Sequence, residues 1–427
     1  MTDPARPVPA RPPGRVVFDL AEIPFSTRGA WTDVSPVVGL HETADHLYLV
    51  SLRTGHRNGL TGVLQLSLWA GGREVDVPVD ADSSRLAWSS ADGTIEAAYD
   101  GPEVLRFRGR GLALRLTDAA TELTPFTGTF LYEDLAVQAL CFTSYETGQR
   151  YRVTVLTGEA TAEGVEALGQ AERWVEVAAT DQEAWEIAVE ELPTTRPAFV
   201  PERSFDEAVA RADRDFADHL ERLAPWRSSA TPAAARAAYV LWSATVAPEG
   251  FLARESVLMS MHWMDKVWSW DHCFIALALG PGDQRAALDQ FLAPFDHQTP
   301  EGALPDSISH SELLYNYVKP PIHGWALARL LPSLDLATDE LQEVHDRLAA
   351  WTRFWLEHRV APGRTAAHYQ HGNDSGWDNA TTFDLDRVVE GPDLAAFLVL
   401  QLGVVRDLAL RLGRDDEAST WDDARHE

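Results

Sequence analysis

The sequence predicts a protein of two parts, an N-terminal antiparallel β-sandwich followed by an all-helical domain. The chain of 427 residues is longer than a single hydrophobic core usually supports, so two domains are expected. Short stretches in the first half alternate apolar and polar residues, which is the pattern of half-buried strands. In the second half, apolar residues recur at the spacing of helix turns between loops that contain Gly and Pro.

Residues 14–196 form the predicted β-sandwich. Period-two runs follow one another at short intervals, for example at 46–52 (HLYLVSL), 62–69 (GVLQLSLW) and 152–156 (RVTVL). Such runs are typical of antiparallel sheets in which each strand turns one face toward the core. Neither a carboxylate pair nor a histidine cluster stands out in this segment, so we expect it to have a structural role.

Residues 197–230 are predicted to form a linker helix region. The apolar residues between 203 and 223 recur at helical spacing among charges, at Phe205, Val209, Phe216 and Leu220. This pattern indicates a helix that lies on a surface. Pro225 is expected to end it, because proline cannot continue a helix.

The predicted helical domain covers residues 231–427. Thr231 is expected to be the N-cap of its first helix, because Pro232 follows at the position that proline prefers. Further helices are predicted at 270–279, 283–297, 322–331, 338–358 and 392–412, and from about residue 414. Since no strand pattern separates them, the domain is predicted to be entirely helical.

Composition excludes several classes of partner. The formal net charge of −29 would repel nucleic acids and anionic membranes from most of the surface. No apolar run is long enough for a membrane span, and the Pro- and Arg-rich start lacks the apolar core of a signal peptide. Cys141 and Cys273 fall in different predicted domains without disulfide or metal-ligand spacing. We therefore expect a soluble cytoplasmic protein without a metal or cofactor.

The most informative stretch is residues 370–384, QHGNDSGWDNATTFD. It places three carboxylates, Asp374, Asp378 and Asp384, around the indole of Trp377 in a Gly-broken segment. Sugars stack their C–H faces on aromatic rings, and an indole that shields a carboxyl raises its pKa toward that of a general acid. The alternative interpretation is an Asp-rich loop that caps a helix.

Three other polar junctions lie in the helical half. They are residues 264–271 (MDKVWSWD), 298–305 (QTPEGALP) and 315–325 (YNYVKPPIHGW). Each alone could be turn and capping chemistry. Together they supply the indoles, amides and carboxylates of a carbohydrate site. The only two lysines of the chain, Lys266 and Lys319, fall within these motifs.

The ordered motifs WSWD, Q-x-P-x-G-x-x-P, PPIHGW and SGWDN resemble those of glycoside hydrolase family 63 and its bacterial relatives. This clan of α-glucoside hydrolases includes trehalases, mannosyl-oligosaccharide glucosidases, and mannosylglycerate and glucosylglycerate hydrolases. The resemblance extends from about residue 24 to the end, with its specific motifs between 268 and 383. It implies a β-sandwich followed by an (α/α)6 barrel, a carbohydrate substrate, and hydrolysis with inversion at the anomeric carbon.

The resemblance also implies roles for individual residues. Asp378 corresponds to the general acid, and Trp270 and Asp271 correspond to contacts in the innermost sugar subsite. Gly376 and Trp377 correspond to lining residues of that pocket. Trp268 and Gln298, in the neighbouring motifs, are further candidates for substrate binding.

Two positions depart from the family pattern. Lys319 stands where relatives usually have Gln before the Pro-Pro pair, and its charge suggests recognition of an anionic aglycone such as a glycerate carboxylate. Asp374 stands where relatives often have Glu, and its role is left open.

Inversion requires a second carboxylate to activate water, about 6.5–9.5 Å from the acid. In the family this base is a Glu on a late barrel helix, so we expect it beyond Glu427 and expect residues 231–427 to form only the first part of the barrel. Glu301, Glu312 and Glu390 are possible replacements. On this expectation the 427-residue chain binds sugar weakly and hydrolyses little.

Two other functions remain open at this point. One is a non-catalytic carbohydrate-binding protein on the same scaffold. The other is a sugar isomerase or epimerase, which would use histidine pairs for proton transfer. The candidate histidines for the latter are His262, His272, His297, His310, His323, His368 and His371.

Overall fold

The structure is a computed structural model that describes residues 15–39, 42–53, 62–120, 122–124, 128–180, 183–262 and 264–426. The chain divides into two compact units. The first extends to Ala244 and includes residues 261 and 262, and the second comprises Thr245–Ser260 and the residues from Met264 onward. Residue 14, the predicted start of the sandwich, lies outside the described residues.

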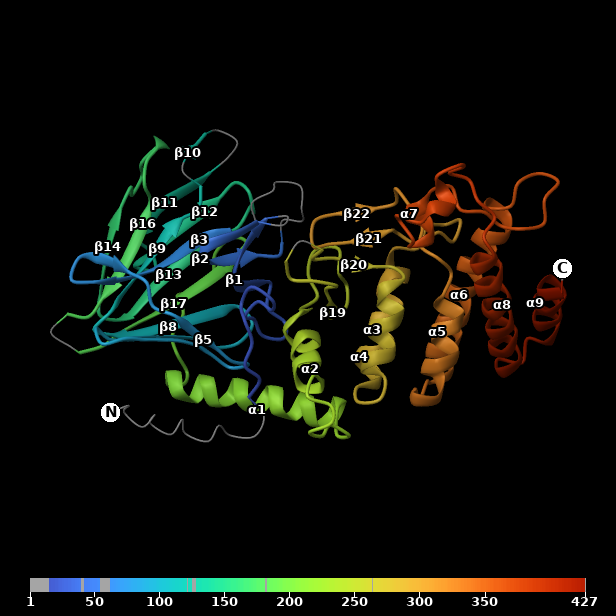
Figure 1. Ribbon diagram of the computed structural model, residues 1–427, viewed down its shortest axis with the longest axis horizontal. Helices are drawn as coiled ribbons and strands as arrows, with labels where there is room; N and C mark the ends of the chain where they lie inside the picture. The colour runs from blue at the N-terminus through green and yellow to red at the C-terminus, as the bar shows by residue number, and fades with distance from the viewer. Residues whose placement is uncertain are drawn as a thin grey trace, which may run out of the picture. The chain divides into compact units, whose positions relative to one another are not determined.

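The first unit contains two large antiparallel sheets (Figure 1). One has the order β1-β2-β3-β9-β16-β14, with β4 on β3, and consists of β1 Thr32–Gly39, β2 Glu42–Ser51, β3 Gly62–Ala70, β4 Arg73–Val75, β9 Ala113–Asp118, β14 Glu159–Glu163 and β16 Trp174–Ala178. The other has the order β11-β12-β13-β17-β8-β7-β6-β5 and consists of β5 Val79–Ala81, β6 Leu86–Ser89, β7 Thr94–Tyr99, β8 Val104–Arg110, β11 Thr129–Asp134, β12 Ala139–Ser144, β13 Arg150–Thr157 and β17 Trp185–Leu192. A short ribbon pairs β10 Glu122–Leu123 with β15 Gly169–Gln170.

The core of this unit lies between the two sheets. Leu64 and Leu114 from the first sheet share a buried cluster with Phe107 and Ile187 from the second. These residues occupy alternate strand positions, as the period-two pattern requires, because successive strand side chains point to opposite faces. The prediction of antiparallel sheets in the first half is therefore confirmed.

Two helices belong to the first unit. Helix α1, Phe205–Leu223, begins with a capping box between Ser204 and Glu207, and its predicted apolar positions are all buried. Helix α2, Ala234–Ser243, buries Tyr239 and Trp242 in the core of the same unit. The predicted N-cap was wrong, because α2 starts after Ala233 without a side-chain cap and the Thr231 hydroxyl instead accepts a bond from the Ser228 N–H.

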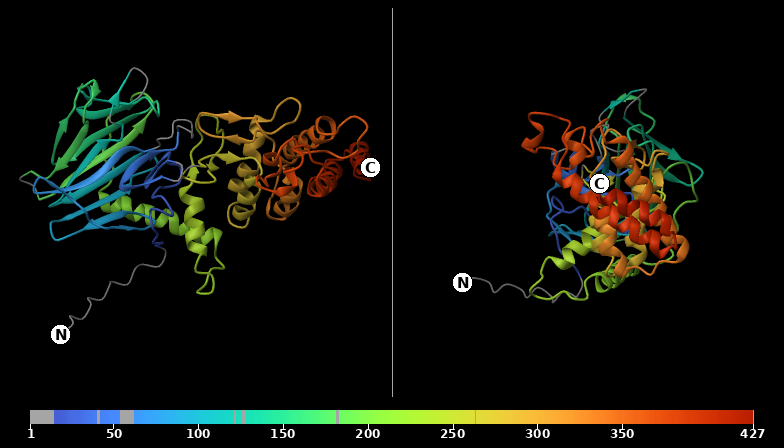
Figure 2. Two further views of the ribbon diagram at one scale, coloured as in Figure 1. Left: turned by 45° about the horizontal axis from the view of Figure 1, so that its top comes forward. Right: turned by 90° about the vertical axis from the view of Figure 1, so that its right-hand side faces the viewer.

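The second unit is helical in most of its length (Figures 1 and 2). Its helices are α3 Asp271–Leu279, α4 Gln284–Leu292, α5 His323–Leu330, α6 Thr338–His358, α7 Gly372–Ser375, α8 Pro392–Arg411 and α9 Asp415–His426, with short 3-10 turns at Ala293–His297, Leu331–Ser333 and Thr381–Phe383. Five predicted segments and the one starting near 414 match these helices to within a few residues. None of the helices in the described part of the chain has the length and apolar character to span a bilayer.

The expectation of a domain without strands was wrong. β18 Thr245–Val246 pairs with β19 Ser256–Val257, and a small sheet has the order β20-β21-β22 with β20 Val267–Trp268, β21 Ser307–Ile308 and β22 Leu313–Leu314. Strands of two residues leave no periodic signal in a sequence. In Figure 1 this sheet and α7 lie at the upper ends of the neighbouring helices, where the motif loops gather.

Candidate active site

The small sheet joins two of the sequence motifs. Val267 and Trp268 of β20 pair with Ile308 and Ser307 of β21. Just beyond, the Ser269 N–H donates to the carbonyl of Asp306 at 3.2 Å. The WSWD motif therefore lies beside the residues that follow the Q-x-P-x-G-x-x-P motif, and Asp306 sits at their junction.

Gly376 brings the SGWD motif against WSWD. Its φ of +70° is a left-handed conformation that favours glycine. A Cβ at this position would meet Cζ2 of the Trp270 indole at 2.4 Å, so the glycine backbone packs directly on the ring. The two motifs that identify the candidate site are thus in contact.

Asp374 fixes the loop that precedes Gly376. The residue is only 1% exposed, and one carboxylate oxygen accepts the Val318 N–H at 3.0 Å. The other oxygen accepts the Gln370 N–H at 2.8 Å and an Arg359 N–H at 2.9 Å. Asp374 therefore connects three chain segments, which answers the question that the sequence left open about its role.

Lys319 has a different environment from the one predicted. Its ammonium donates to the carbonyl of Asn373 at 2.7 Å and lies 3.2 Å from the Asp306 carboxylate and 5.5 Å from the centre of the Trp268 ring. The residue is 6% exposed. Because the charge is neutralised inside the unit, this geometry does not support recognition of an anionic aglycone by Lys319.

Sequence reasoning missed Asp306. It is 3% exposed and directly follows the proline that ends the Q-x-P-x-G-x-x-P motif. A charged residue is unusual between an apolar turn and a buried strand. This position in the sequence could have identified Asp306 as a candidate site residue. Its partner, Lys319, is equally unusual as one of only two lysines in the chain.

Three carboxylates influence one another electrostatically at the junction of the motifs. The pKa of Asp271 is raised to about 6, mainly by burial and also by the nearby carboxylates of Asp306 and Asp378, while Lys319 acts to lower it. The pKa of Asp306 is raised by burial, lowered by Lys319, and raised by Asp374 and Asp378. Asp271, Asp306 and Asp378 therefore influence one another electrostatically, together with Lys319.

The raised pKa of Asp271 gives a stability prediction. Between about pH 4 and pH 6 the native state holds a proton that the unfolded state has lost, so stability falls as pH rises through this window. Asp271→Asn removes this partly buried charge, and we expect it to stabilise the helical unit by about 1–2 kcal/mol at pH 8 and by almost nothing at pH 4. Urea unfolding at both pH values measures the difference. Asp384→Asn, an exposed site, is the control, and equal stabilities of Asp271→Asn and wild type at pH 8 would contradict the raised pKa.

Asp378 and Trp377 are both exposed in the structure, and the indole retains 66% of its accessible surface. The expected shielding of the carboxyl by the neighbouring indole is therefore absent. Two hydrogen bonds within the loop hold it instead. The Trp377 N–H donates to the Ser375 hydroxyl, and this hydroxyl donates to the Gly372 carbonyl. Asp378 is thus exposed to solvent on a loop that these hydrogen bonds hold, and its charge acts on Asp271 and Asp306.

Gln298 lies outside this group of contacts. Its amide nitrogen donates to the carbonyls of Gly302 at 2.9 Å and Arg347 at 3.0 Å. Both bonds fix the turn between Gln298 and Ala303, where Gly302 has a φ of +93°. The described contacts give Gln298 a structural function.

His323 supports the WSWD motif from behind. Its Nδ1 accepts the Trp351 indole N–H at 3.1 Å, so Nε2 holds the proton and donates to the Ser269 carbonyl at 3.0 Å. Burial lowers its pKa to about 4, and the same is true of His272. These two histidines are therefore neutral structural residues, a finding that argues against a histidine-based isomerase.

Other candidate histidines are engaged elsewhere. The His297 ring is 2.6 Å from the Phe251 carbonyl, and the His371 ring accepts the Asn373 N–H at the start of α7. Two of the possible replacement bases are also paired. Glu312 binds Lys266 at 3.1 Å, and Glu390 binds Arg364.

Comparison with known proteins relates the residues that contain the contacting motifs to a glycoside hydrolase family. Residues 264–426 match the family model described as the mannosylglycerate hydrolase MGH1-like glycoside hydrolase domain. The resemblance to family 63 and its bacterial relatives is thereby confirmed over the residues that contain the motifs. A comparison with the curated proteins found no match.

Two solved structures agree in fold with nearly the whole chain. A bacterial glucoamylase complexed with acarbose has a TM-score of 0.60 at 9% identity, over 98% of this chain and 68% of that chain. A putative kojibiose phosphorylase from the human microbiome has a TM-score of 0.57 at 10% identity, over 97% and 70%. A mannosylglycerate hydrolase of family 63 from Thermus thermophilus, in complex with glucose, is 22% identical with a TM-score of 0.32, and the match covers 37% of this chain and 54% of that chain. The matched region thus spans about half the length of that hydrolase.

Proposed function

We propose that this protein is an inverting α-glycoside hydrolase of a small α-glucoside, α-mannoside or oligosaccharide, built on a barrel of the (α/α)6 type. The observation that supports it most is the packing of Gly376 on the Trp270 indole, which unites the WSWD and SGWD motifs. The matching family model points to the same chemistry.

In this proposal Asp378 is the general acid that protonates the departing glycosidic oxygen. Asp378 is exposed and its charge acts on Asp271, so both carboxylates are assigned to one sugar site. Asp271 binds hydroxyl groups of the innermost sugar, and the indoles of Trp268, Trp270 and Trp377 offer faces for its C–H groups. Asp306 and Lys319 form a buried ion pair behind these side chains, and this pair determines the local charge of the proposed site.

Inversion also requires a carboxylate base about 6.5–9.5 Å from the acid. Glu312 and Glu390 have cationic partners, and we assign the base to neither.

The decisive variant is Asp378→Asn. We expect it to lower turnover of an α-glycoside by about 10²–10⁴-fold, because the amide cannot donate a proton to the leaving group. Proton NMR of the first product anomer reports inversion directly. Asp384→Asn, further along the same exposed loop, should leave the rate unchanged.

Two outcomes would contradict this assignment. Release of a product with retained configuration would exclude the inverting mechanism. Sugar binding without turnover, unchanged by Asp378→Asn, would favour a non-catalytic carbohydrate-binding protein instead.

We also propose a cytoplasmic location. Both cysteines, Cys141 and Cys273, are free and buried, which suits a reducing compartment.

A further inference from the structure

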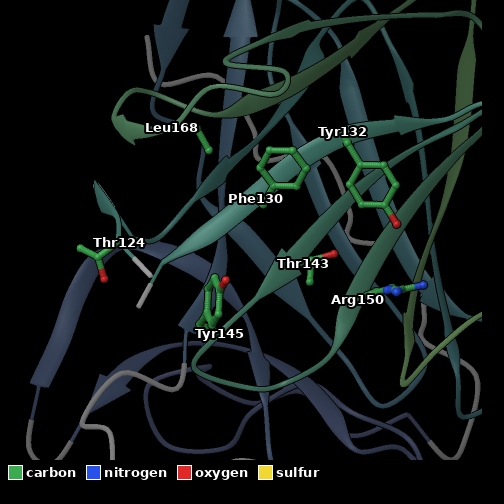
Figure 3. A pocket seen from close by; sticks show the side chains of 7 residues that line it. All are labelled: Thr124, Phe130, Tyr132, Thr143, Tyr145, Arg150 and Leu168. Atoms are coloured by element: carbon green, nitrogen blue, oxygen red, sulfur yellow. The ribbon is translucent and has the colours of Figure 1, made fainter. Parts of the chain in front are cut away.

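The β-sandwich unit contains a hollow that its structural role does not explain. It lies on the outer side of β11, β12 and β13 and has a volume of about 610 Å³, the size of a small-molecule site. Figure 3 shows its lining, in which aromatic rings, hydroxyl groups and one guanidinium face a common space. Its lining includes Phe130, Tyr132, Thr143, Tyr145, Arg150 and Leu168.

Strand register places the hollow opposite the core. Leu131, Phe142 and Tyr151 are fully buried between the sheets. Because neighbouring side chains alternate across a sheet, Phe130 and Tyr132 must point outward. The outward face of a sandwich strand usually has polar residues, so two aromatic rings on the edge strand β11 require an explanation.

The two rings form a flat platform. The centroids of Phe130 and Tyr132 are 5.9 Å apart and their planes differ by only 16°. Phe130 is paired across the sheet with Thr143, which is paired with Arg150, so a hydroxyl and a guanidinium lie next to the platform. The arrangement combines a wide apolar surface with hydrogen-bonding groups at its side.

Exposed apolar side chains border the platform. Tyr145, after β12, is 54% exposed, and Leu168, before β15, is 76% exposed. The chain near Leu168 is attached to the platform strand, because the Glu166 N–H donates to the Leu131 carbonyl at 2.7 Å. A ligand that covers these apolar groups would exclude water from them, and this burial would favour binding.

Charge decides between ligand classes. Arg150 is the only cationic side chain in the described lining, and it donates to the Thr194 carbonyl at 2.7 Å. A single guanidinium that is already partly engaged, on a chain of net charge −29, is poorly suited to hold a polyanion. A neutral ligand with flat apolar faces and hydroxyl groups fits the lining better.

We propose that this hollow is a second carbohydrate-binding site, which takes a neutral oligosaccharide on the Phe130–Tyr132 platform. The choice of an oligosaccharide rests on the proposed function, since a glycoside hydrolase gains from a surface that retains a longer substrate. Sugar rings stack on the two aromatic faces, and Thr143 and Arg150 bind their hydroxyl groups. This site is separate in sequence from Asp378 and does not use any residue of the helical unit.

Isothermal titration calorimetry of maltopentaose tests the proposal in the Asp378→Asn full chain, which should not consume the ligand. We expect Phe130→Ala and Tyr132→Ala each to weaken binding at the sandwich site by at least about tenfold. Tyr145→Ser, on an exposed turn, should weaken it with no effect on folding. Trp226→Ala is the matched control, because Trp226 is an exposed aromatic residue of the same unit outside the hollow.

The same variants in the active background separate the two proposals. Hydrolysis of a small chromogenic α-glycoside, measured without maltopentaose, should be unchanged by Phe130→Ala, Tyr132→Ala and Tyr145→Ser. Unaltered maltopentaose affinity in all the aromatic variants would overturn the second site and leave the proposed hydrolase intact. A change of sedimentation coefficient in these variants would also overturn it, because the hollow would then be covered by a second copy of the chain.

Discussion

Asp374→Ala is expected to lower the free energy of unfolding of the helical unit by about 3–5 kcal/mol, the cost of leaving a buried charge without its partner. The guanidinium of Arg359, 8% exposed, lies between the Asp374 carboxylate and the rings of Phe354 and Trp355. Removal of the carboxylate also leaves the N–H groups of Val318 and Gln370 without their acceptor.

The loss should extend to sugar binding. Val318 precedes Lys319, whose ammonium binds the Asn373 carbonyl next to Asp374. The two segments thus support each other through Asp374, which precedes Asp378 in the same stretch of chain. We expect calorimetric sugar binding to disappear in Asp374→Ala even at temperatures where the unit stays folded.

Graded variants separate charge from shape. Asp374→Asn retains an acceptor for one backbone N–H but lacks the charge that pairs with Arg359, so its loss should be smaller than that of alanine. Glu390→Ala removes a carboxylate from an exposed pair with Arg364 in the same unit, and its unfolding midpoint should match wild type. If Asp374→Ala and Glu390→Ala unfold at the same urea concentration, Asp374 does not anchor the loop.

Helices were the part of this fold most accessible from the sequence. The segments at 338–358 and 392–412 were predicted nearly to the residue because both have long apolar periods and acidic first turns, and Gly391 and Pro392 mark the start of the second. Thr231 was misassigned because its hydroxyl has a local alternative, a bond within the turn that begins at Ser228. Two-residue strands such as β20 and β21 depend on tertiary pairing alone and give no pattern to read.

The candidate site was accessible only in part. Residues on motif positions, such as Trp270, Gly376 and Asp271, were named and do lie together. Gln298 belongs to the same set of motifs, yet its amide donates to backbone carbonyls. Spacing along the chain cannot distinguish an amide that binds substrate from one that binds the backbone.

Lys319 and Asp306 show a second limit. The charge of Lys319 suggested an anionic ligand, but a buried cation and a buried anion from different loops neutralise each other in the fold. An ion pair between two loops depends on the tertiary structure. The burial of Asp306 and Lys319 therefore had to be known before the pair could be identified. The pair also explains how Asp271 and Asp378 can lie near a third carboxylate, because Lys319 offsets part of the repulsion.

Gly376→Ala is expected to reduce sugar binding and any hydrolysis by about 10²-fold, through displacement of the Trp270 ring or of the loop that presents Asp378. The new methyl group would stand 2.4 Å from the indole, a distance that real contacts do not reach. Either the ring or the loop must shift, and both belong to the proposed sugar site.

Gly413→Ala is a closely matched control. Gly413 has a φ of +71°, against +70° for Gly376, but no atom lies within 4 Å of its hypothetical Cβ. Both alanine variants should therefore incur the same left-handed strain of about 1–2 kcal/mol, which thermal unfolding measures. Only Gly376→Ala meets the indole, so the difference in sugar affinity between the two variants isolates the contact on which the proposed site depends. Equal affinities would mean that Trp270 and the SGWD loop bind no common ligand.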